Sequence, residues 1–250
     1  MKGQQPLRIA LMTAMLLSAH LSRPAHAQTP LLEALKLRDF VRVERLVESG
    51  VDVNAGFADG KTALMVAAKR GMSTLVAKLL QAGARVNATN NNDGTALMFS
   101  AIRGDLRTIK LLLAHGAQIN AVGANRWGAI MIAAVKGHAE IVTELLRRGA
   151  EPDLADVYGW TPLMRAANRN RHATVRRLLG NPRTDIAHRD DDGATALHRA
   201  AEEGHLTMVE LLVELGADVH ALDASGRTAA KRAALAEHPE VAVVLRSRLR

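Results

Sequence analysis

The stretch Thr62-Ala63-Leu64-Met65 decides the fold, because close copies of it recur along the 250-residue chain at a nearly constant interval. The copies are Thr29-Pro30-Leu31-Leu32, Thr95-Ala96-Leu97-Met98, Gly128-Ala129-Ile130-Met131, Thr161-Pro162-Leu163-Met164 and Thr195-Ala196-Leu197-His198. The third residue of each copy falls at 31, 64, 97, 130, 163 and 197, which gives steps of 33 residues and one final step of 34. A fixed period of this length indicates stacked repeats, each too small to bury its apolar face alone.

Two helices are expected in each repeat. Threonine followed by proline or alanine is a favourable start for a helix. Glycines then lie where a first helix must end in a left-handed turn, at 71, 104, 137 and 204. A second apolar run with helical spacing, such as residues 75–80, ends at a further glycine in most repeats.

Other segments of the repeat identify a family. They include Ala133-Ala134-Val135-Lys136-Gly137-His138, Val209-Glu210-Leu211-Leu212 and Gly216-Ala217-Asp218-Val219. With the recurring Thr-Pro-Leu element, the chain resembles ankyrin-repeat proteins over residues 29 to about 230. The resemblance implies an all-α solenoid of stacked helix-turn-helix units with short β-hairpin fingers, and a function in protein binding.

The period divides the mature chain, 28–250, into about six repeats and a cap. The repeats are expected at 29–57, 58–90, 91–123, 124–156, 157–190 and 191–223. Residues 224–250 are expected to form a terminal half-unit whose basic residues face water as a C-terminal cap.

Residues 1–27 have the pattern of a secretory signal peptide. Lys2 and Arg8 precede an apolar stretch from Ile9 to Leu21, and Ala25-His26-Ala27 provides small residues for cleavage after Ala27. The apolar stretch is shorter than the roughly 20 residues of a spanning helix. We therefore expect a periplasmic or secreted protein with no membrane span after cleavage.

Catalytic and metal-binding motifs are not apparent in the sequence. The chain has no cysteine, and it shows no phosphate-binding glycine loop, nucleophile elbow or zinc-protease helix. The methionines at 65, 98, 131 and 164 are interpreted as core residues, because adjacent repeats are too far apart to share one metal ion. We expect no catalytic residue, no metal and no cofactor.

The large aromatic residues gather at two adjacent fingers. Trp127 and Trp160 occupy equivalent positions one repeat apart, and Tyr158 lies two residues before Trp160. The resemblance places these tips on the recognition surface, and aromatic residues are frequent binding hot spots. Two interpretations stand at this point: the rings contact a partner, or they cap the stack of fingers.

Basic residues recur where the family's first helix faces the concave side. They are Lys69, Arg70, Arg103, Lys136 and Arg169, and Arg126 and Arg165 lie in the same neighbourhood. Such a row favours a protein partner with an acidic patch. Nucleic acid is not expected, because of the expected export and the acidic residues 190–192.

The sequence therefore predicts a monomeric, non-catalytic interaction module, acting as a periplasmic scaffold or as the protector of a partner protein. A periplasmic inhibitor, such as an immunity protein against a toxin, would use the same surface. An enzyme or metal-handling protein with an unrecognised site is the third alternative.

Overall fold

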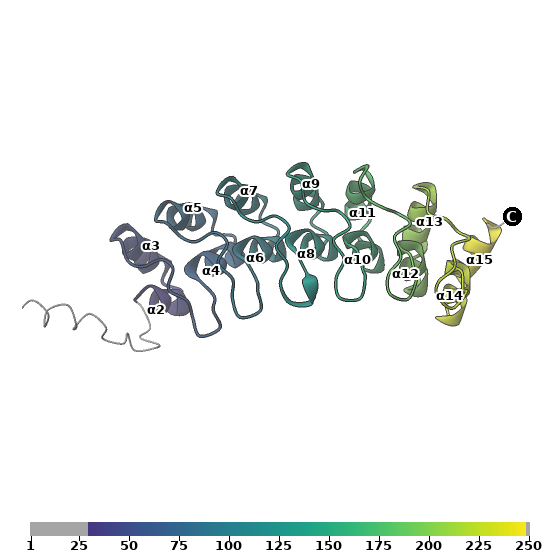
Figure 1. Ribbon diagram of the computed structural model, residues 1–250, viewed down its shortest axis with the longest axis horizontal. Coiled ribbons are helices and arrows are strands. Elements are labelled where there is room, and N and C mark those ends of the chain that lie inside the picture. Colours follow the sequence, from purple (N-terminus) through teal and green to yellow (C-terminus); the bar gives the residue numbers. More distant parts are fainter. Residues whose placement is uncertain (1–29, 249–250) are drawn as a thin grey trace, which may run out of the picture.

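The computed structural model describes residues 30–248, which form a rod of two helical rows (Figure 1). The inner row, from which the loops at the bottom of Figure 1 project, contains α2 (Pro30–Leu37), α4 (Ala63–Arg70), α6 (Ala96–Arg103), α8 (Ala129–Lys136), α10 (Pro162–Asn168), α12 (Ala196–Glu202) and α14 (Ala229–Leu235). The outer row contains α3 (Phe40–Glu48), α5 (Ser73–Gln81), α7 (Leu106–Ala114), α9 (Ala139–Arg147), α11 (His172–Leu179), α13 (Leu206–Glu214) and α15 (Pro239–Ser247). The predicted all-α solenoid is confirmed, whereas the predicted signal peptide lies outside the described residues.

The inner helices begin at the expected threonines and end at the expected glycines in most of the repeats that contain them. In α4, α6 and α10 the threonine hydroxyl accepts a hydrogen bond from the backbone N–H three residues later, at 3.3–3.4 Å. Gly71, Gly104 and Gly137 adopt φ values of 70°, 84° and 79° at the turns into the outer helices. A residue with a Cβ atom is strained in this conformation, which explains the recurrence of glycine.

The core follows the repeat. The leucine or isoleucine that marks the period is at most 2% exposed in every described repeat. The methionines at 65, 98, 131 and 164 are at most 4% exposed, in agreement with their interpretation as core residues. Fully buried alanine pairs, such as Ala67 and Ala68, let neighbouring inner helices stack closely.

The loops that precede the inner helices are the fingers, with tips at residues 57–61, 90–94, 123–127, 156–160, 190–194 and 223–227. In the described chain their β structure is limited to two isolated bridges, Gly56 to Thr62 and Val122 to Gly128. A short 3₁₀ turn, η1 (Ala124–Arg126), lies in the third of these tips. Each tip is joined to the next by one backbone hydrogen bond, for example from Val157 N to Asn125 O at 3.2 Å. The fingers therefore form one continuous edge along the rod.

The C-terminal cap differs from the expected half-unit. Residues 224–248 contain α14 and α15, a complete helix pair that packs on the preceding repeat. Thr228 caps α14 through a 3.3 Å hydrogen bond from Lys231 N, as the threonines of earlier repeats do. Among residues 30–248, no helix exceeds nine residues or is apolar enough to cross a membrane.

Candidate partner-binding surface

Trp127, Arg165, Trp160 and Arg199 form an arginine–tryptophan stack along the fingers. The guanidinium carbon of Arg165 lies 5.4 Å from the ring centre of Trp127 and 4.2 Å from that of Trp160. The guanidinium carbon of Arg199, from the next repeat, lies 4.4 Å from the Trp160 ring centre. These distances are those of cation–π contacts, so the stack links three consecutive repeats.

A buried aspartate in the finger, Asp156, holds Arg165 in the stack. Asp156 accepts hydrogen bonds from the backbone of Tyr158 at 2.9 Å and of Trp160 at 3.1 Å, and from Arg165 Nε at 2.8 Å. The carboxylate thus fixes the fold of the finger and the direction of the arginine together.

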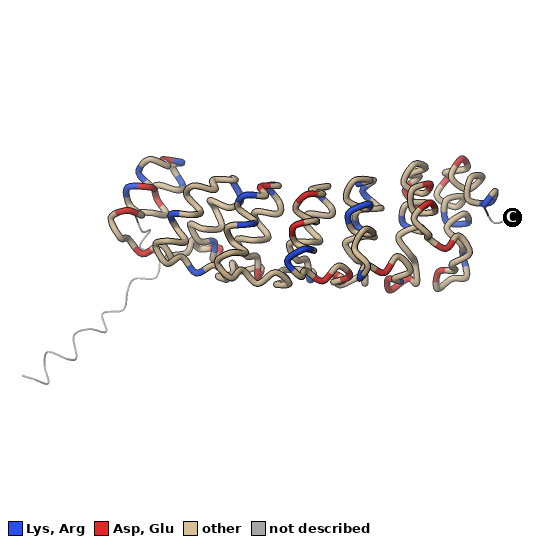
Figure 2. Tube along the Cα trace, turned by 90° about the horizontal axis from the view of Figure 1, so that it is seen from above, with Lys and Arg blue, Asp and Glu red and all other residues tan. Residues whose placement is uncertain are grey.

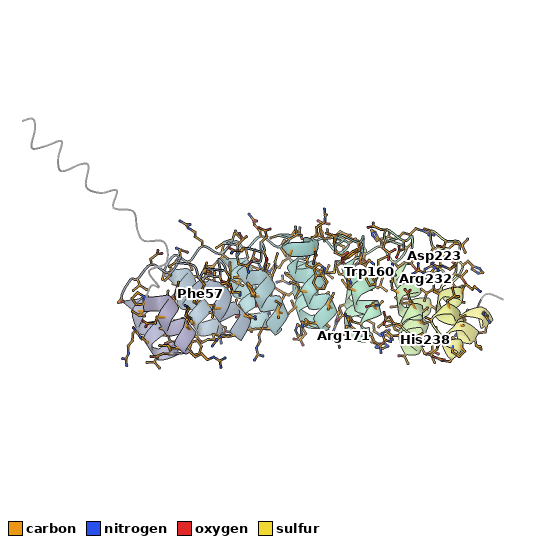
Figure 3. All side chains as sticks on the ribbon, turned by 90° about the horizontal axis from the view of Figure 1, so that it is seen from below. Phe57, Trp160, Arg171, Asp223, Arg232 and His238 are labelled. Atoms are coloured by element: carbon orange, nitrogen blue, oxygen red, sulfur yellow. The ribbon has the colours of Figure 1, made fainter. Side chains whose placement is uncertain are left out.

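The same arrangement recurs in the next two repeats. Asp190 binds Arg199 Nε at 2.8 Å, and Asp223 binds Arg232 Nε at 2.6 Å. Burial acts to raise the pKa of Asp223, but hydrogen bonds from the backbone of Arg227 and the side chain of Arg232 outweigh it and hold that pKa far below its usual range. Figure 3 shows Asp223 and Arg232 on the same edge of the rod as Trp160.

The earlier repeats replace this ion pair with neutral residues. At the positions of the three arginines they carry Val66, Phe99 and Ile132, and at the positions of the three aspartates they carry Phe57, Asn90 and Gly123. At this position of the inner helix, arginine is therefore present only where the finger provides an aspartate nine residues earlier. This fixed offset is the sequence signal that could have revealed the pairs, and our sequence interpretation missed it.

Further carboxylates extend the pairs into a network at the last three repeats. Arg199 contacts Asp190 at 2.6 Å, Asp192 at 2.7 Å and Glu202 at 3.1 Å. Glu202 also contacts Arg232 at 3.2 Å. The guanidinium group of Arg199 is thus shared by three carboxylates, and Glu202 links it to Arg232.

The three aromatic residues selected from the sequence differ in their burial. Trp127 and Trp160 are half-buried against the core, and Trp160 is covered by two guanidinium groups. Tyr158 is 61% exposed at the finger tip, where a partner can reach its ring. Arg165 points into the stack, and Arg126 is exposed and donates from Nε to Ala155 O at 3.2 Å.

The basic residues of the inner helices fall at equivalent positions. Arg70, Arg103 and Lys136 are the last residues of α4, α6 and α8, and Arg169 follows α10 directly. We call these four residues the basic row. Lysine and arginine at a helix C-terminus interact favourably with the helix dipole, so the row also stabilises its helices.

The basic row has no ion-pair partner among residues 30–248. Arg103, Lys136 and Arg169 are exposed, while Arg70 packs on the Phe40 ring at 5.1 Å. Lys69, beside the row, is exposed and lies 5.9 Å from the Phe99 ring centre.

The row lies at the opposite end of these helices from the fingers, and helices of 8 or 7 residues separate the two by about 10–12 Å. Charges of both signs are distributed over the rest of the rod (Figure 2).

His198 has a structural role. His198 is fully buried, its Nδ1 contacts Thr195 Oγ1 at 2.9 Å, and its Nε2 contacts Arg227 O at 3.1 Å. Burial lowers the pKa of His198, so the ring is neutral near pH 7. In the described part of the chain, no three His, Asp or Glu side chains are grouped as a metal site requires.

Comparisons with known proteins agree with this architecture. A family model described as ankyrin repeats in three copies matches residues 7–90, 31–123, 68–156, 97–190, 130–223 and 163–248. The crystal structure of the human ASB11 ankyrin repeat domain is similar, with a TM-score of 0.77 and 26% sequence identity, over 87% of this chain and 97% of that domain. A search of curated proteins gives no match.

Proposed function

We propose, from the premise that this chain belongs to the ankyrin-repeat family, that it is an exported scaffold or protector that binds an acidic partner protein. Ankyrin repeats are protein–protein interaction modules, and the fold is typically a non-catalytic scaffold. Export to the periplasm is proposed on the sequence of residues 1–27.

The basic row carries the proposal. Four cations occur at the same position of four consecutive repeats, and none is neutralised by an ion pair within residues 30–248. Elsewhere on the rod several cations are paired, as Lys78 is with Glu44 and Glu48 at 2.9 Å. An unpaired row of like charge lowers its energy by approaching a surface of opposite charge, and it accelerates the encounter.

The finger tips supply the second part of the surface. Tyr158 is exposed beside the arginine–tryptophan stack, at the start of α10, and Arg169 follows the end of the same helix. A partner that spans this helix would contact an aromatic anchor and the basic row together. Because buried Asp–Arg pairs hold the finger, little ordering is required on binding.

The test uses two charge-reversal variants of equal size. Arg103→Glu, Lys136→Glu and Arg169→Glu are combined in one variant, and Arg107→Glu, Lys110→Glu and Arg177→Glu on the outer row form the control. The partner is isolated from the periplasm of the source cells on the immobilised protein, identified, and titrated by calorimetry at several salt concentrations. We expect the inner-row variant to lose at least about tenfold in affinity and most of the salt dependence, and the control to bind normally.

Equal binding by both variants would remove the basic row from the interface. Export is tested separately by fractionating the cells and sequencing the N-terminus of the protein. A mature chain that starts at Gln28 in the periplasmic fraction is expected. An intact N-terminus in the cytoplasmic fraction would reject the proposed location.

A further inference from the structure

We propose that the pocket between the 156–160 and 190–194 fingers binds a basic side chain, an arginine or a lysine, of the partner. This inference rests on the proposed protein-binding function and names one of its contacts. It also adds a contact of opposite sign to the basic row.

The pocket is built by two neighbouring repeats. Tyr158, Trp160 and Arg165 line one side, and Asp191, Asp192 and Arg199 line the other. Its volume of about 350 Å³ lies near the lower end of the range for ligand pockets, about 300–1,000 Å³, which suits a single side chain. A hydrogen bond from Asp191 N to Tyr158 O, at 3.3 Å, keeps the two tips together.

The exposed charges at the mouth of the pocket are negative. The two lining arginines point inward: the side chain of Arg165 is 19% exposed and that of Arg199 is 9% exposed. Each is bound to its own buried aspartate, so neither is free to attract an anion. The side chain of Asp192 is 66% exposed although it contacts Arg199.

Asp191 is the group that remains free. It is exposed, and its carboxylate has no hydrogen-bond or ion-pair partner within residues 30–248. The hydroxyl of Tyr158 likewise makes no hydrogen bond to the described chain. The pocket therefore offers an unpaired carboxylate and a phenol oxygen, both of which accept hydrogen bonds from an ammonium or guanidinium group.

The aromatic side of the pocket favours the same ligand. The adjacent stack already places guanidinium groups over indole rings at 4.2 and 4.4 Å. Tyr158 is the exposed ring at this position, and a partner cation over it would make one further contact of the same kind. An apolar side chain could touch the ring but would leave the carboxylate of Asp191 without a partner.

The two tryptophans make the inference directly measurable. The chain contains only Trp127 and Trp160, so a ¹⁵N-labelled sample gives two indole N–H signals, which the variant Trp127→Phe assigns. The full-length protein is titrated with N-acetyl-arginine N-methylamide, whose only charge is the guanidinium group. The corresponding citrulline derivative, similar in shape and uncharged, is the control ligand.

We expect the Trp160 signal to shift saturably with the arginine derivative and to move little with the citrulline derivative. The Trp127 signal, which belongs to a residue outside the pocket, should shift less. Asp191→Asn should weaken binding by about 3- to 10-fold, the effect of one exposed charge contact. Asp93→Asn, an equal charge change at another finger, should leave the affinity unchanged.

Three results would overturn the inference: no shift at Trp160, equal shifts with both ligands, or full affinity in Asp191→Asn. The titration needs no partner protein, so its failure would remove this pocket while the charge-reversal test of the basic row stands. A positive titration combined with unchanged partner binding in both charge-reversal variants would instead reject the basic row and retain the pocket.

Discussion

Replacing Asp153 with asparagine should stabilise the protein at neutral pH. In two earlier repeats an asparagine at this position bridges to the next repeat. Asn54 accepts from Arg85 N at 2.8 Å and donates from Nδ2 to Gly83 O at 3.1 Å. Asn87 makes the equivalent pair of bonds with Gln118 N at 2.8 Å and Gly116 O at 3.0 Å.

Asp153 can make only half of this bridge while it is ionised. Its Oδ2 accepts from Asp185 N at 2.9 Å, but its Oδ1 is buried and has no hydrogen-bond partner. Asparagine would add one hydrogen bond, worth about 1 kcal/mol, and remove an unsatisfied buried acceptor, worth about 1–3 kcal/mol. Because the residue is only half-buried, we expect a gain of about 1–2 kcal/mol in the free energy of unfolding at pH 7.

The gain should depend on pH. Burial raises the pKa of Asp153, the hydrogen bond from Asp185 N and the charge of His188 oppose this rise, and the carboxylates of Asp185 and Glu151 add to it. Because the pKa of Asp153 is higher in the folded state than its unfolded value of 3.8, the protonated side chain gives its full stabilisation only when the pH is below 3.8. This stabilisation is lost as the pH rises through the pKa of the folded state. The advantage of asparagine should therefore be largest at pH 7 and small near pH 4.

Urea unfolding followed by circular dichroism at pH 7 and pH 4 measures both effects. The reverse substitution, Asn87→Asp, is the matched control and should destabilise the protein at pH 7 but much less at pH 4. If Asp153→Asn brings no gain at pH 7, or the same gain at both pH values, the assignment of an unsatisfied carboxylate is wrong.

Two further predictions concern the fingers. Gly193→Ala should lower the free energy of unfolding in urea by about 1–3 kcal/mol more than Gly226→Ala, although both glycines have φ near 70°. The reason is that a Cβ at Gly193 would lie 2.7 Å from a backbone nitrogen of the next finger, whereas Gly226 faces open space. Equal losses would show that the fingers are not in close contact. Asp156→Ala should cost about 3–5 kcal/mol in the same assay, because Arg165 and two backbone N–H groups lose their partner. The double variant Asp156→Asn with Arg165→Phe, which copies the neutral residues Asn90 and Phe99, should recover most of that loss, and no recovery would contradict the role given to the pair.

The sequence was sufficient for features that depend on residues close together in the chain. A threonine cap or a glycine turn such as Gly104 acts on the helix next to it, so its period is visible directly. The C-terminal cap was predicted as a half-unit because Ala230 occupies the position of the recurring leucine. This substitution conceals one more copy of the repeat, in which Thr228 is in register with Thr195.

The site was less predictable because its contacts join different parts of a repeat. The pairing of Asp156 with Arg165 becomes evident only when the finger folds back over the start of α10. From sequence alone, Arg165 was grouped with the exposed cations and Trp160 with possible contact residues. Burial of both side chains follows from the stacking of neighbouring fingers, which no single repeat reveals.

The buried ion pairs matter more for geometry than for stability. Replacing a buried pair with well-packed apolar residues is often neutral or stabilising, and the first repeats of this rod have such residues, for example Phe99 and Ile132. The last repeats keep charged pairs where the fingers carry the exposed Tyr158 and Asp191. A directional pair fixes the angle of the finger, which apolar contact does not. We infer that the ionic half of the rod holds a preorganised pocket, while the basic row extends along the neutral half, so that the two surfaces meet at α10.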